Sequence, residues 1–122
     1  MKTKSQIEHE ICEAMIRFEK EYMGRGPVET QAFVVDNMVV VRLKGVLTPA
    51  EMQLVEVSDP ERGCRLVKNM RIQLLEKGRP LLESVVEAVT GQKLQSLHTD
   101  ISTKTGERLI IFTVPEKLPQ SA

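Results

Sequence analysis

Aromatic residues are scarce in this chain. They make up 3% of its 122 residues, and tryptophan is absent. The core must therefore be built from aliphatic side chains and the six methionines. The sequence also lacks a run of about 20 apolar residues, which a membrane-spanning helix needs. Its N-terminal residues lack the apolar segment of a secretory signal. We therefore expect a cytoplasmic protein that does not insert into a membrane.

Net charge is also absent, because 17 acidic residues balance 17 basic ones. This balance argues against broad electrostatic binding of nucleic acid or an anionic membrane. One basic run recurs every three residues, at Arg62, Arg65, Lys68 and Arg71. A spacing of three drifts around a helix, and acidic residues flank the run. We interpret it as a solvated helix face.

Metal and redox motifs are missing as well. Cys12 and Cys64 do not have the spacing of a metal or redox site, so two free thiols in a reducing compartment are expected. His9 and Glu13 lie one turn apart on a predicted helix, but the sequence supplies no third ligand. We predict neither a metal site nor a cofactor.

The segment from Asp36 to Glu51 contains a turn, a strand and a helix start. Residues 36–37 tolerate the backbone of a tight hairpin turn. Along the strand 38–46, Val39, Val41 and Leu43 share an apolar face. The alternate positions run from Val40 to Arg42 and Lys44, so the other face becomes charged, which is typical of a strand with one buried face. Thr48 begins a capping box that ends at Glu51, with proline at the first helical position. These signals predict a hairpin followed by a helix.

The remaining elements follow from periodicity. We predict a helix over 5–22, begun by a Ser5–Glu8 capping box, and a strand over 28–35 that completes the first hairpin. A long helix begins at Pro60 after Asp59 and is expected to kink or break near Gly78. Strands over 94–102 and 108–114 form a second hairpin. The predicted buried stripe of the long helix is Val67, Met70, Leu74, Leu81, Val85 and Ala88.

These elements predict one α+β domain over residues 1–122, with an ordered core of about 5–114 and a frayed tail over 115–122. The order α-ββ-αα-ββ predicts a two-layer sandwich, in which helices cover one face of a mainly antiparallel four-stranded sheet. The last strand is apolar on both faces, which suggests a central position or a covering partner. We predict that Ile110, Phe112 and Val114 lie on the uncovered face and favour a homodimer.

Four polar residues are candidates for binding. Arg25 lies at the tip of a Gly-Arg-Gly-Pro loop, where binding residues often occur. His98 and Asp100 share one face of a predicted strand, and Arg42 lies on another strand. If these four side chains converged, they could form the pocket of a small enzyme or a ligand sensor. No nucleophile is placed beside the His98–Asp100 pair, so we predict no catalytic residues.

Several motifs together resemble a small bacterial family, once known only as a domain of unknown function. It is now described as the MpsC-like component of a sodium-translocating, membrane-potential-generating system. The resemblance covers about residues 5 to 114. The motifs that carry it are Gly24-Arg25-Gly26-Pro27, residues 41–51 (VRLKGVLTPAE), Arg65, Arg71, Thr90-Gly91-Gln92-Lys93, Asp100-Ile101-Ser102 and Ile111-Phe112.

The resemblance implies a soluble accessory or regulatory module associated with a membrane transport system. A second interpretation is a KH-like nucleic-acid module, with the residues from Arg62 to Arg79 as a basic edge. A KH domain has a G-x-x-G loop between its paired helices. Residues 58–63 contain two acids and one glycine at that junction, which counts against nucleic-acid binding.

Overall fold

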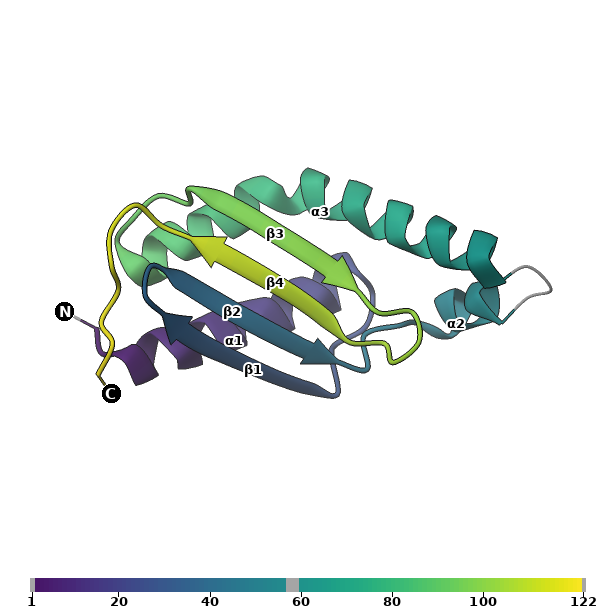
Figure 1. Cartoon of the computed structure of the whole chain (residues 1–122), viewed down its shortest axis with the longest axis horizontal. Coiled ribbons are helices and arrows are strands. Elements are labelled where there is room, and N and C mark those ends of the chain that lie inside the picture. Colours follow the sequence, from purple (N-terminus) through teal and green to yellow (C-terminus); the bar gives the residue numbers. More distant parts are fainter. Residues whose placement is uncertain (1, 57–59, 122) are drawn as a thin grey trace.

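The computed structural model describes residues 2–56 and 60–121. One four-stranded sheet lies in front of the helices, and both chain ends lie at the same end of the sheet (Figure 1). This arrangement confirms the predicted α+β class and the predicted order of elements. The elements are α1 (Lys4–Tyr22), β1 (Glu29–Val35), β2 (Met38–Lys44), α2 (Pro49–Val55), α3 (Pro60–Thr90), β3 (Ser96–Ile101) and β4 (Arg108–Thr113).

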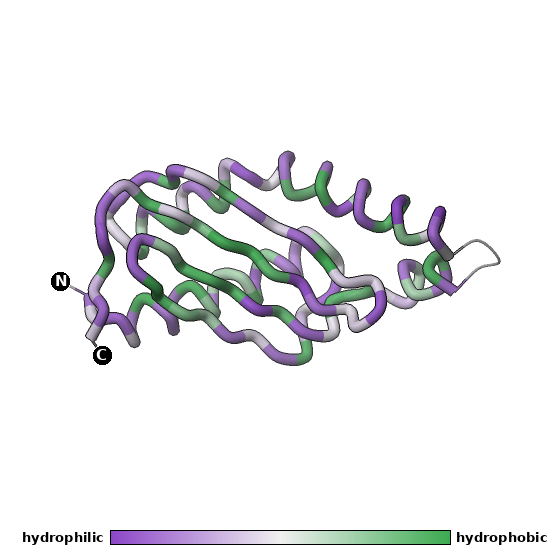
Figure 2. The backbone as a smooth tube through the Cα atoms, viewed as in Figure 1, coloured by the Kyte–Doolittle hydropathy of each residue, from purple (hydrophilic) through white to green (hydrophobic). Residues whose placement is uncertain are grey.

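The strand order, which the sequence did not reveal, is β1-β2-β4-β3 with every pair antiparallel. The two hairpins therefore join through β2 and β4, where Val41 pairs with Ile110. These two central strands carry long hydrophobic runs (Figure 2). The predicted central position of the last strand is confirmed. β1 and β3 form the two edges.

The turn and the second helix start follow the sequence closely. Asp36 adopts the left-handed backbone expected of the hairpin turn, with φ of 57°. The capping box of Thr48 and Glu51 is present, with proline in the first helical turn. The predicted Ser5–Glu8 box is wrong, because α1 is capped by Thr3, whose hydroxyl accepts a hydrogen bond from the Gln6 backbone N–H at 3.2 Å. Asp59, the predicted cap of α3, lies outside the described residues.

The buried stripe of α3 differs from the prediction by one position along most of its length. Counting apolar residues placed Met70 and Leu81 in the core, yet their side chains are 41% and 52% exposed. The observed stripe includes one charged residue and two glycines, which apolar counting passes over. Its members are Gly63, Val67, Arg71, Leu75, Gly78, Leu82, Val86 and Val89.

α3 runs as one helix through Pro80, so the predicted break near Gly78 is wrong, and the alternative of a kink there stays a prediction. Pro80 leaves the carbonyl of Glu76 without its helical partner. Both residues are exposed, so water can satisfy that carbonyl. Gly78 instead marks a close helix crossing, because a Cβ there would lie 2.7 Å from Cε1 of Phe18 on α1. This glycine serves packing between α1 and α3.

The segment after β4 is ordered over residues 115–121, which corrects the prediction of a frayed tail. Leu118 is 4% exposed and belongs to the core. Its backbone N–H donates to the carbonyl of Asp36 at 3.0 Å, and the Gln120 side chain bonds the same residue. The segment therefore anchors the β1–β2 turn.

Candidate functional site

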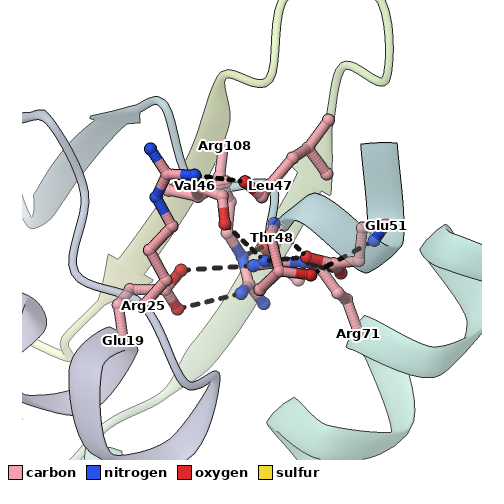
Figure 3. Close-up of polar contacts among 9 residues, drawn as sticks. Glu19, Arg25, Val46, Leu47, Thr48, Glu51, Arg71 and Arg108 are labelled. Carbon is pink, nitrogen blue, oxygen red and sulfur yellow. Dashed lines mark hydrogen bonds and ion pairs between the residues drawn. The ribbon is translucent and has the colours of Figure 1, made fainter. Parts of the chain in front are cut away.

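Four charged side chains meet beneath the sheet, one from each of α1, α2, α3 and β4 (Figure 3). Glu19, Glu51, Arg71 and Arg108 are all 3% exposed or less, and we call them the buried charge cluster. Arg71 binds Glu51 with two hydrogen bonds, Nε to Oε2 and Nη2 to Oε1, both 2.7 Å. Its Nη1 donates to Glu19 at 3.2 Å, and Arg108 Nη1 donates to the other Glu19 oxygen at 3.1 Å.

Backbone groups of the β2–α2 loop complete the cluster. Arg71 Nη2 donates to the carbonyl oxygen of Val46 at 2.7 Å. The backbone N–H of Thr48 donates to Oε1 of Glu51 at 2.8 Å. Arg25 lies beside the cluster, and its Nη1 donates to the carbonyl of Leu47 at 3.1 Å. These contacts hold the loop between α1 and α3.

The sequence contained a signal for this cluster that hydrophobic counting missed. Arg71 lies four residues after buried Val67 and four before buried Leu75, on the inward stripe of α3. Arg108 occupies the inward register of β4, two residues before buried Ile110. A charged residue at a core position of a periodic pattern predicts a buried ion pair. The interpretation of Arg71 as part of a solvated face is therefore wrong.

Two positive and two negative charges make the cluster formally neutral. Burial alone would raise the pKa of Glu51, but hydrogen bonds from Arg71 and Thr48 outweigh burial and hold that pKa below its ordinary value. Burial opposes the charge on Arg71, but Glu51 and Glu19 outweigh it and raise the arginine pKa. Burial is the largest cause and lowers the pKa of Arg108. Glu19 and Glu51 offset burial only in part, and repulsion by Arg71 lowers the pKa further. Arg108 is therefore the less compensated cation.

We expect the protein to lose stability in acid through Glu51. The pKa of Glu51 is lower in the folded state than in the unfolded chain. Its contribution to the free energy of unfolding is therefore fully present at pH values above the ordinary glutamate pKa of about 4.3. That contribution is lost as the pH falls through the lower folded value, because protonation then favours unfolding. The free energy of unfolding should be measured by urea denaturation between neutral pH and pH 3.

The matched variants for this test are Glu51→Gln and Glu87→Gln. The first removes the titrating group and should flatten the fall of stability with acid, at the cost of lower stability at neutral pH. Glu87 is exposed on α3, so its replacement should leave the curve unchanged. Equal acid dependence in wild type and Glu51→Gln would contradict the assignment.

The structure places three of the four predicted binding residues on one surface. Arg42 and Asp100 both pair with Leu109 on β4, so they lie in one row across the uncovered sheet face, about 10 Å apart. His98 lies in the next row, beside Ile111. Arg25 does not join them, because it lies at the β2–α2 loop.

Of these three residues, Arg42 and Asp100 each have an ionic partner, and His98 is exposed. Arg42 binds Glu107 at 2.7 Å, and Asp100 binds Lys68 of α3 at 3.3 Å. The four residues thus form no common pocket.

The predicted interface residues face the wrong way. Ile110, Phe112 and Val114 are 0% exposed and lie in the core under the helices. Because side chains alternate along a strand, their neighbours Leu109 and Ile111 face outward instead. The prediction had the correct strand but the opposite face.

The uncovered face carries an apolar surface all the same. Phe33, Val40 and Ile111 lie in register across three strands. Phe33 is 47% exposed, and Val35 and Leu109 are 48% and 39% exposed. We call these five residues the outward apolar patch.

Residues 2–56 and 60–121 contain neither a metal-binding cluster nor a membrane-spanning helix. No set of three or more His, Cys, Asp or Glu side chains is placed to hold a metal ion. No helix in these ranges has both the length and the apolarity to cross a bilayer. Cys12 and Cys64 are free thiols, as expected. The pKa of Cys12 is raised, mainly by burial and further by the negative charges of Glu8 and Glu13.

Comparison with known proteins gives a family and two relatives. Residues 3–116 match the family described as "Na+-translocating membrane potential-generating system (MpsC)". The chain is 38% identical over 120 residues to uncharacterized protein YbcI of Bacillus subtilis, covering 98% of this chain and 94% of YbcI. It is 26% identical over 113 residues to uncharacterized protein YrhF of the same organism, covering 92% and 90%. No solved structure matches. The chain therefore belongs to the MpsC family.

Proposed function

We propose that this chain is a non-enzymatic, cytoplasmic accessory subunit that acts as a homodimer and associates with a sodium-translocating membrane system. The family description supplies the membrane system. The two free thiols support a reducing compartment.

The outward apolar patch is the observation that carries the proposal. Phe33 and Val35 are each about half exposed on a sheet face that no helix of the described chain covers. A contiguous apolar surface with a charged rim is typical of a protein interface. Arg42 and Asp100 supply such charges on either side of Leu109.

The non-enzymatic part rests on how the ionisable groups are used. Glu19 and Glu51 are bound by arginines, so neither carboxylate is available as a proton donor. A shared catalytic pocket would have to bring Arg25, Arg42, His98 and Asp100 together. Arg25 lies apart from the other three.

The test uses Phe33→Glu, which places a charge in the patch, and Met70→Glu as the control on α3. Sedimentation velocity should show a wild-type dimer whose dissociation constant rises at least about tenfold in Phe33→Glu, because a buried aromatic anchor often contributes over 1.4 kcal/mol. Capture from gently solubilised native cells should recover integral membrane subunits with wild type and Met70→Glu.

A monomeric wild type would remove the homodimer from the proposal. Recovery of the chain alone from the membrane fraction would remove the membrane system. Unchanged association in Phe33→Glu would show that the outward apolar patch is not the interface.

A further inference from the structure

A small cavity lies between α3 and the edge strand β3, beside the buried charge cluster. Its volume is about 20 Å³, which is room for one water-sized group. Three cationic side chains line it, namely Lys68, Arg71 and Arg108, against one carboxylate, Asp100. The remaining lining residues are Ile72, Thr99 and Ile101.

Arg108 has hydrogen-bonding capacity left at this cavity. Its Nε donates to Thr99 Oγ1 at 3.3 Å and its Nη1 donates to Glu19, while Nη2 donates to no described residue. The residue as a whole is 1% exposed. Thr99 accepts from Nε and keeps its own hydroxyl hydrogen for donation. Arg108 and Thr99, which both have a donor to spare, line the same small volume.

Charges of both signs lie on the approach, where Lys68 pairs with Asp100 and Arg65 pairs with Glu61. Lys68 and Ile72 also line a shallow surface depression of about 600 Å³, together with Arg62, Arg65 and others. The Lys68–Asp100 ion pair lies at the cavity mouth, with Lys68 42% and Asp100 78% exposed. Exposed pairs of this kind are weak, so the mouth can open.

We propose that this cavity is a binding site for a small inorganic anion of chloride size, held by Arg108 Nη2, the Thr99 hydroxyl and Lys68. A water-sized volume admits a monatomic anion, and unspent donors of a buried guanidinium favour a negative charge. The lowered pKa of Arg108 agrees, because burial leaves that cation incompletely compensated. The site does not depend on the proposed accessory function.

The test is the ³⁵Cl NMR linewidth of sodium chloride titrated into the full chain, at constant ionic strength set with sodium gluconate. Wild type should give saturable broadening. Lys68→Met should raise the dissociation constant about threefold, and Asp100→Asn should lower it about threefold, as expected for exposed charges near an ion. Lys77→Met, on the exposed face of α3, should match wild type. Arg108→Lys keeps a cation near Glu19 but removes Nη2, and should abolish the saturable component.

Sodium phosphate provides the second arm. Competition by phosphate would support an anion site whose mouth opens for larger oxyanions, and lack of competition would support a site limited to monatomic ions. Absence of saturable broadening in wild type would overturn the proposal. Equal broadening in wild type, Lys68→Met and Asp100→Asn would also overturn it, and this comparison does not depend on the folding of Arg108→Lys.

Discussion

Replacing Arg71 by methionine is expected to lower the free energy of unfolding by about 3–5 kcal/mol. The guanidinium makes two hydrogen bonds to Glu51, one to Glu19 and one to the Val46 carbonyl. Methionine fills a similar volume but leaves Glu19 with the Arg108 donor and Glu51 with the Thr48 backbone N–H among the described contacts. A loss of this size is a large part of the 5–15 kcal/mol that stabilises a typical domain.

Urea unfolding followed by circular dichroism, at one fixed protein concentration, measures this loss. Arg65→Met is the matched control on the same helix, because Arg65 is 66% exposed and forms only an exposed pair with Glu61. That variant should change stability by less than about 0.5 kcal/mol. Arg71→Met with a loss below about 1 kcal/mol would contradict the importance of the buried charge cluster.

A double-mutant cycle separates the ion pair from the packing. Glu51→Gln removes the opposing charge, so its combination with Arg71→Met should cost less than the two single losses together. Residues in direct contact show coupling of about 0.5–3 kcal/mol. Additive losses would mean that the pair contributes through shape alone.

Replacing Gly63 by alanine is expected to cost about 3 kcal/mol, near the upper end for overpacked sites. A Cβ at Gly63 would lie 1.8 Å from the carbonyl oxygen of Leu54 and 2.7 Å from its carbonyl carbon. These are backbone atoms of α2, so the short helix must move away from α3. That movement also pulls Glu51 away from Arg71, which couples this site to the buried charge cluster.

Gly26→Ala is the control for this substitution. A Cβ at Gly26 would meet nothing closer than Lys20 Cβ at 4.0 Å. Its alanine should therefore be neutral or stabilising by a few tenths of a kcal/mol, because alanine restricts the unfolded chain. Thermal unfolding checks both variants, and equal melting temperatures for Gly63→Ala and wild type would contradict the close crossing.

Local signals in the sequence predicted most elements of this fold. Asp36-Asn37 specified the first hairpin turn, and Thr48 and Glu51 specified the start of α2, because turns and caps depend on neighbouring residues alone. Alternation along β2 identified its buried face. The family was also predicted correctly from short motifs, because their order and spacing are given by the sequence alone.

Two of the errors share one physical cause. The α3 stripe and the outward face of β4 depend on which side of an element meets the rest of the molecule. For β4, which is apolar on both faces, alternation alone does not say which face the helices cover. For α3, counting apolar residues passed over Arg71, whose burial is tolerable only because Glu19 and Glu51 come from other helices.

The sequence by itself determined the class of fold, the order of elements, the first hairpin turn, the start of α2, and the family. The tertiary structure alone decided the strand order, the union of Glu19, Glu51, Arg71 and Arg108, and the cavity beside them. The reason is that buried charges are stabilised only by partners far away in the chain. Their pairing depends on three-dimensional packing, and no local pattern encodes it.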